Sequence, residues 1–105
     1  MYSSRIKSEE IDGLFRAILT LQNEEDCYRF FEDLCTIHEL QAMAQRMEVA
    51  AQLDQGLTYA VVAAGTGASS ATISRVSRCL GYGADGYRNA LDRLKAAEEA
   101  KREGQ

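Results

Sequence analysis

The stretch GLTYAVVAAGTGASSATISRVSRCLGYG, from Gly56 to Gly83, decides the fold that this sequence predicts. It contains two short segments of helical character, Tyr59–Gly65 and Ser70–Leu80, separated by a turn. Gly67 lies in that turn and is free to adopt a positive φ, while Ser69 stands where the second helix needs an N-cap. Two helices at this spacing are typical of a helix-turn-helix unit.

A helix-turn-helix unit packs through an apolar inner face and needs a small residue where its helices cross. In residues 57–80, Val62, Ile73 and Val76 are the inward apolar residues, and Ala63 is the small one. The same pattern also fits a purely structural corner of two packed helices. Spacing alone leaves that alternative open.

The outward residues of this unit are small, hydroxylated or basic. Small side chains at the start of a helix let it approach base edges in the major groove of DNA. Hydroxyl and free backbone N–H groups suit phosphate oxygens, and arginine reaches phosphate or guanine. We therefore expect the helix over Ser69–Leu80 to read double-stranded DNA. The predicted DNA-binding residues are Thr58, Ser69, Ser70, Ala71, Thr72, Ser74, Arg75 and Arg78.

The rest of the chain also predicts helices. It has 105 residues and no proline, and its apolar residues recur at helical spacing, which indicates one all-α domain over residues 1–105. A C-terminal helix is predicted over residues 87–102. Three glycines indicate a flexible loop before it, in which Tyr82 and Tyr87 are interpreted as packing anchors. We place the N-terminal helices in residues 8–55.

The first two predicted helices are more apolar than a chain of this length easily buries. Their stripes are Ile11, Leu14, Phe15, Ile18 and Leu19, then Cys27, Phe30, Phe31 and Leu34. Excess apolar surface of this kind is typical of a subunit interface. We therefore interpret residues 8–55 as dimerisation helices and predict a homodimer. The alternative is that both stripes pack only on the third helix, about Ile37–Gln55, which a capping box of Thr36 and Glu39 opens.

The net charge of −4 is distributed unevenly. Residues 1–55 hold five Lys or Arg against eleven Asp or Glu, whereas residues 56–88 hold three against one. The helix-turn-helix unit is therefore the basic part of an acidic chain. This permits local phosphate contact with a small footprint and modest affinity.

Several classes of protein are not expected. No apolar run approaches the roughly 20 residues of a membrane span, and no secretory signal is evident, so a cytoplasmic location without a membrane partner is the default. Cys27, Cys35 and Cys79 have neither disulfide nor zinc spacing, and we expect buried or half-buried free thiols. His38 stands alone, so no metal site is predicted. No catalytic set or phosphate-binding loop is present, which predicts no enzymatic activity and no cofactor.

Longer stretches resemble a known family. DLCTIHELQAMAQRMEVAAQLDQG, then GLTY and TGASSATISRVSRCLGYGADGY, closely resemble the Trp repressor-like YerC/YecD family. The resemblance covers about residues 8–90. It implies a Trp repressor-like helical fold with interlocked subunits and a DNA-binding transcriptional regulator.

The resemblance also offers a test for an effector. The corepressor site of the more distant Trp repressor corresponds to Thr36, Arg46, Thr72 and Arg75, and all four residue types match. We therefore consider an amino-acid-responsive repressor as an alternative. The two arginines have other uses: they contact DNA or pair with acidic residues. For Arg46, an ion pair with neighbouring glutamates of the long helix is the leading structural explanation.

Two other positions argue against tryptophan as that effector. Val76 replaces the glycine beside which the indole ring lies, and Cys79 replaces a serine that helps hold the ammonium group. The valine side chain fills space that a flat ring needs, and a thiol is a weak hydrogen-bond partner. Tryptophan binding is therefore not expected.

The first helix of the unit carries no charge. Ala60 and Ala63 stand where the resemblance implies basic residues that contact the DNA backbone, and Ala64 and Gly65 offer no charge either. Each lost phosphate contact weakens binding and reduces the slope of log affinity against log salt concentration by about 0.9. Either the chain binds DNA weakly or cooperatively, or this helix contacts a protein partner in a dimeric interaction module. The sequence leaves both alternatives open.

Overall fold

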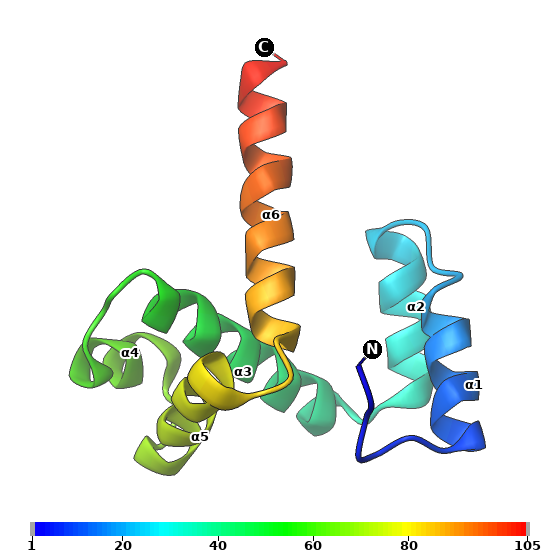
Figure 1. The fold of residues 1–105 in the computed structure, drawn as a ribbon, viewed down its shortest axis with the longest axis horizontal. Helices are drawn as coiled ribbons and strands as arrows, with labels where there is room; N and C mark the ends of the chain where they lie inside the picture. Colours follow the sequence, from blue (N-terminus) through cyan, green and yellow to red (C-terminus); the bar gives the residue numbers. More distant parts are fainter. Residues whose placement is uncertain (1, 105) are drawn as a thin grey trace. The chain divides into compact units, whose positions relative to one another are not determined.

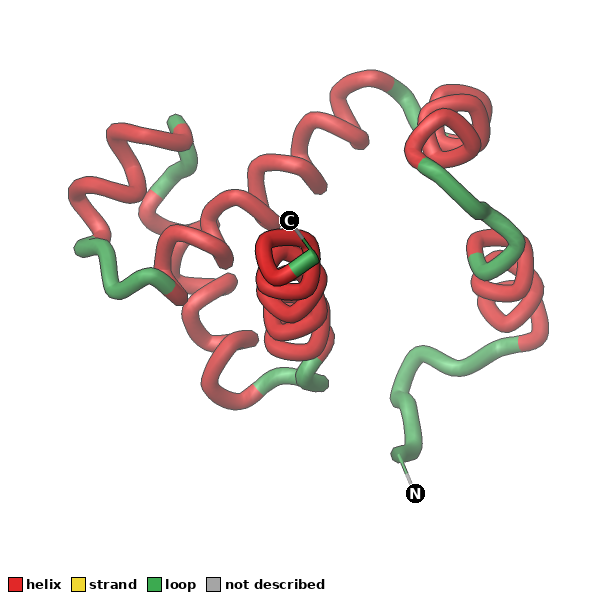
Figure 2. The backbone as a smooth tube through the Cα atoms, turned by 90° about the horizontal axis from the view of Figure 1, so that it is seen from above, coloured by secondary structure: helices red, strands yellow, loops and turns green. Residues whose placement is uncertain are grey.

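The computed structural model describes residues 2–104, and within them six helices and no strand are present (Figure 1). Figure 2 looks nearly along the axis of α6 and shows short connections between the helical segments. The predicted all-α class is confirmed. The helices are α1 (Glu9–Ile18), α2 (Glu24–Leu34), α3 (Ile37–Asp54), α4 (Tyr59–Thr66), α5 (Ser70–Tyr82) and α6 (Gly86–Glu103).

The chain forms two compact units, one ending at Leu40 and the other beginning at Gln41. The first unit contains α1, α2 and the start of α3, and the second contains the rest of α3 and α4 to α6. Our interpretation of residues 1–105 as a single domain stays a prediction.

Side-chain caps define where the helices begin. Each cap oxygen accepts a backbone N–H that the first turn of a helix leaves unpaired. Ser8 and Asn23 accept from Ile11 and Asp26 in this way, at 3.1 and 2.8 Å. Thr36, Thr58 and Ser69 cap α3, α4 and α5 in the same way, and the caps at Thr36 and Ser69 were predicted.

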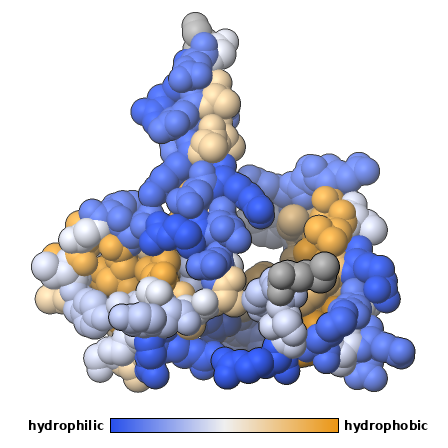
Figure 3. Space-filling model, viewed as in Figure 1, coloured by the Kyte–Doolittle hydropathy of each residue, from blue (hydrophilic) through white to orange (hydrophobic). Residues whose placement is uncertain are grey.

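The first unit buries little of its own apolar surface. No residue of α1 or α2 is fully buried, although Phe30 and Phe31 make an edge-to-face contact with ring centroids 5.4 Å apart. Leu19 is 82% exposed. Figure 3 shows the resulting apolar surface on this unit. The other large apolar residues of this unit that are about half exposed or more are Tyr2, Ile6, Phe15, Tyr28, Leu34 and Ile37.

The second unit has a compact apolar core to which every one of its helices contributes. Met47, Leu53 and Tyr87 are partly buried against it. Beyond Leu91 every described residue of α6 is exposed, and Figure 1 shows this half of the helix standing clear of the other helices of the unit. The buried core residues are Val49, Ala50, Val62, Ala68, Ile73, Val76 and Leu91.

The turn between α4 and α5 depends on a glycine. Gly67 has φ +72°, in the left-handed region that side-chain-bearing residues adopt only with strain. The carbonyl of Thr66 accepts a hydrogen bond from Gln45 Nε2 of α3 at 3.1 Å, while the Thr66 hydroxyl donates to Val62 O and accepts from Ala68 N. The carbonyl of Thr66 is thus paired, and the turn is held to α3.

The helix α5 is longer than predicted. We expected it to end at Leu80 and placed Gly81 in a flexible loop, but the helix continues through Gly81 to Tyr82. It ends at Gly83, where an added Cβ would lie 2.9 Å from Cys79 Cα. The backbone geometry after the last turn of α5 therefore requires Gly83, because a Cβ there would clash with Cys79.

An ion cluster joins α3 to α6. The carboxylate of Asp54 accepts hydrogen bonds from Lys95 Nζ at 2.5 Å and from Arg88 Nη1 at 2.6 Å, and the Asp54 side chain is only 9% exposed. These two hydrogen bonds hold the pKa of Asp54 below its usual range, and the bond from Lys95 has the larger effect. The hydrogen bond to Asp54 raises the pKa of Arg88 in turn.

We predict that Asp54→Asn lowers the free energy of unfolding at neutral pH by about 1–3 kcal/mol, because both cations lose their shared carboxylate. Since the folded pKa of Asp54 lies below its unfolded value, the stabilisation is complete above about pH 4 and is lost as the pH falls further. Urea unfolding at fixed protein concentration, from pH 7 to acid, measures this difference.

The matched control is Asp92→Asn, whose side chain is 59% exposed and lies 3.9 Å from the same arginine. Its effect should stay below about 0.5 kcal/mol. A difference between Asp54→Asn and the parent chain that persists undiminished at pH 2 would contradict the assignment.

Candidate nucleic-acid interface

The start of α5, within the predicted DNA-binding surface, is held by a side-chain cap. Ser69 Oγ accepts from Thr72 N at 3.2 Å and donates to Thr72 Oγ1 at 3.1 Å. The Ser69 hydroxyl and the half-buried Thr72 are therefore engaged in holding the first turn. The preceding cap is similar, because Thr58 Oγ1 accepts from Val61 N at 3.3 Å. These hydroxyls contribute to the shape of the surface more than to free hydrogen-bonding capacity.

The remaining predicted residues all lie on the outer face of α5. Its inner face is fixed because Ile73 and Val76 are each 1% exposed in the core. The structure thus brings the predicted residues together on one exposed surface. They are Ser70, Ala71, Ser74, Arg75 and Arg78.

The two arginines of α5 carry unpaired positive charge. Within residues 2–104, neither Arg75 nor Arg78 forms an ion pair. The first turn of a helix also presents backbone N–H groups and a partial positive charge to an anion. The outer face of α5 therefore combines small side chains, one hydroxyl-rich turn and two available cations.

The outer surface of α4 is uncharged, as the sequence indicated. Tyr59 is 48% and Val61 52% exposed, and Leu57 in the preceding turn is also exposed. Figure 3 shows apolar surface in the region of α4 and this turn. The surface of α4 and the preceding turn therefore has no cation that could contact a phosphate group.

Arg88 does not replace the missing charges. Arg88 follows α5 in the chain, but it is occupied by Asp54 and has Asp92 as a second neighbour. Arg93 is exposed and has no ion pair within the described part of the chain. The sequence could not show this, since Asp54 and Arg88 are far apart along the chain.

The predicted effector residues have varied surroundings. Thr36 caps α3, because its hydroxyl accepts from Glu39 N at 3.1 Å while its own N–H donates to Glu39 Oε1 at 2.8 Å. The hydrogen bond from the Thr36 backbone N–H, and after it an interaction of the carboxylate with the Thr36 side chain, hold the pKa of Glu39 below its usual range. Thr72 and Arg75 belong to α5, as described above. The ion pair expected for Arg46 is absent within residues 2–104, so that explanation was wrong.

The reason lies in the partners of the neighbouring glutamates. Glu39 is engaged in the capping box, and Glu48 Oε1 accepts from Gln52 Nε2 at 3.1 Å. Arg46 is instead half-buried on α3. At the positions that argue against tryptophan, Val76 is buried in the core and Cys79 is half-buried.

Sequence reasoning missed one prominent side chain. Tyr82 was interpreted as a packing anchor, but it is 92% exposed, because the longer α5 carries it on its last turn. Tyr87 is partly buried against the core, as expected. Tyr82 is exposed because Gly81 continues the helix instead of beginning a loop. Cys27 also departs from expectation, since its thiol is exposed while Cys35 and Cys79 are half-buried.

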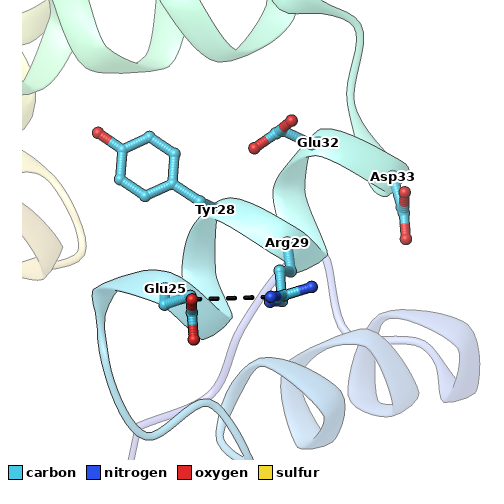
Figure 4. A pocket seen from close by; sticks show the side chains of 5 residues that line it. All are labelled: Glu25, Tyr28, Arg29, Glu32 and Asp33. Carbon is cyan, nitrogen blue, oxygen red and sulfur yellow. Dashed lines mark ion pairs between the residues drawn. The ribbon is translucent and has the colours of Figure 1, made fainter.

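Other surfaces offer no comparable chemistry. A depression of about 430 Å³ lies on α2. Figure 4 shows the side chains that line it: Arg29, which pairs with Glu25 at 3.6 Å, and Tyr28, Glu32 and Asp33. These are side chains of one solvated helix. Among residues 2–104, no cluster of His, Cys, Asp or Glu has the geometry of a metal site. No helix in that range combines the length and apolar character needed to cross a membrane.

Comparison with known proteins agrees with this geometry. Residues 9–95 match the family described as Trp repressor protein. The uncharacterized protein YerC of Bacillus subtilis (strain 168) is 55% identical over 98 residues, which cover 93% of this chain and 94% of YerC.

Two solved structures are similar in fold. A Staphylococcus aureus protein described as a candidate Trp repressor has a TM-score of 0.84 and 50% identity, covering 89% of this chain and 96% of that one. A TrpR-like protein from Eubacterium eligens ATCC 27750 has a TM-score of 0.83 and 48% identity, covering 87% and 94%. The chain therefore belongs to the Trp repressor family and has a Trp repressor-like, all-α fold.

Proposed function

We propose that this protein is a transcriptional regulator that binds double-stranded DNA sequence-specifically through the helix-turn-helix of α4 and α5. The observation that carries the proposal is the outer face of α5, where small residues and two unpaired arginines are exposed opposite a rigid apolar face. Membership of the Trp repressor family supports the same function. An enzymatic role has no comparable support.

The contacts divide into two kinds. Ser70, Ala71 and Ser74, at the start of α5, are small enough to let the helix approach base edges. Arg75 and Arg78 lie further along and reach phosphate or guanine. Base contacts then specify the sequence, while phosphate contacts supply most of the affinity.

We further propose that the protein acts as a homodimer through the N-terminal helices. The support is the apolar surface that α1 and α2 leave exposed in one chain, including Leu19 and Phe15. Such a surface is large for a soluble chain without a partner. Two copies of α5 about 34 Å apart would enter successive major grooves, so the target is a pseudo-palindrome.

One observation favours a second candidate function. The uncharged outer surface around Tyr59 and Val61 suits a protein contact better than a phosphate. A dimeric interaction module with weakened DNA binding would use it. The DNA experiment below separates the two functions.

We predict that selection from random duplex DNA at low salt enriches a pseudo-palindrome. Arg75→Ala combined with Arg78→Ala should weaken binding to it at least tenfold, because two cations are lost from each α5. The slope of log affinity against log salt should fall by about 0.9 for each phosphate contact removed. Gel shifts over a salt series measure both quantities.

The matched control is Lys101→Ala combined with Arg102→Ala, which removes the same charge from the exposed end of α6. Its affinity should stay close to that of the parent chain. A library in which no sequence is enriched would reject DNA reading and leave the interaction module as the proposal.

We predict a sedimentation mass of twice 11.6 kDa at micromolar concentration. Leu19→Lys should shift the protein toward monomer, because burying a lysine in an apolar interface is unfavourable. Circular dichroism would verify that helix content is retained. A parent chain that sediments as a monomer at tens of micromolar would contradict the dimer.

We predict no binding of tryptophan in isothermal titration calorimetry at millimolar ligand. Val76 fills the position where the indole ring would lie, and it is 1% exposed. Heat that saturates with a 1:1 stoichiometry would overturn this expectation and favour an amino-acid-responsive repressor.

A further inference from the structure

Tyr82 exposes an aromatic ring that the fold does not use. It is 92% exposed, whereas Tyr87, in the next helix, is partly buried against the core. No hydrogen bond of the Tyr82 hydroxyl is present within residues 2–104. Gly81 and Gly83 flank it, so no neighbouring side chain along the chain shields the ring. The residue therefore presents a free phenol at the end of α5.

The helical register places this phenol on the proposed DNA-facing side. Ala71, Arg75, Arg78 and Tyr82 follow one another at steps of four, three and four residues, which form one stripe along a helix. At about 100° per residue, Tyr82 lies within about 20° of Ala71 around the axis. All four residues are exposed. The inner face, with Ile73 and Val76, points into the core.

The position along the axis indicates which part of DNA Tyr82 meets. With a rise of 1.5 Å per residue, Tyr82 lies about 16 Å beyond Ala71. The major groove is about 12 Å wide, so a helix that enters it with its first turn carries its last turn to the sugar-phosphate wall. A hydroxyl there meets phosphate oxygens and not base edges.

We propose that the Tyr82 hydroxyl donates a hydrogen bond to a DNA phosphate at the edge of the groove. This inference rests on the proposed function and adds a backbone contact that supplements the uncharged α4. A phenol carries no positive charge, so the contact releases no counterion. It stabilises specific and non-specific complexes alike, because phosphates are present in every sequence.

The experiment compares Tyr82→Phe with the parent chain on the selected DNA and on an unrelated duplex. Loss of the hydroxyl should weaken binding about five- to tenfold on both, with an unchanged salt slope. Tyr2→Phe is the matched control: it removes the hydroxyl of a tyrosine that is 72% exposed ahead of α1, outside the proposed dimerisation helices, and should leave affinity unchanged. Tyr82→Phe keeps the ring, so folding is preserved, and sedimentation verifies the oligomeric state.

Three results would overturn the proposal. One is an affinity for Tyr82→Phe within twofold of the parent chain. Another is a loss restricted to the selected sequence, which would indicate a base contact. The third is a shallower salt slope. If the arginine variants still lose binding in any of these cases, DNA reading stands and only the Tyr82 contact fails. If the parent chain enriches no DNA, both proposals fail.

Discussion

Burial of Ile73 and Val76 against the rest of the second unit is the constraint on which the outer face of α5 depends. Each is 1% exposed in a cluster to which α3, α4 and α6 also contribute. A helix with two fixed inward residues three positions apart has only one orientation about its axis. The remaining side chains must then face outward, whatever their chemistry. The core therefore determines which residues are available to a ligand, and the left-handed Gly67 determines the angle at which α5 leaves α4.

Electrostatics in the second unit divides its cations into two groups. Asp54 engages Arg88 and Lys95, and in doing so attaches α6 to the end of α3. The charges of Arg88 and Lys95 therefore stabilise the fold. Arg75 and Arg78 have no such partner within the described residues and lie on the exposed face of α5. The net charge of −4 hides this division, because the acidic residues are concentrated in the N-terminal half.

Local signals in the sequence predicted the helices well, since caps act over three residues. Thr36 and Ser69 each accept the expected N–H. Interactions between distant residues were not predictable in this way. The Asp54 cluster joins positions more than thirty residues apart. The predicted end of α5 was also wrong: Gly81 resembles a helix stop, yet the helix continues through it to Tyr82 and is capped by Gly83. The predicted DNA contacts themselves stay predictions, although the structure exposes the surface that they require.

An uncharged α4 has a physical consequence if α5 reads DNA as proposed. Non-specific binding is almost wholly electrostatic, so fewer phosphate contacts shorten the time spent on unrelated sequences. Contacts to base edges by the start of α5 are unaffected, so discrimination between sequences is preserved while total affinity falls. Neutral contacts, such as a phenol at the groove edge, restore affinity without increasing its salt dependence. A regulator built in this way holds its target over a wider range of ionic strength than one whose supporting helix is basic.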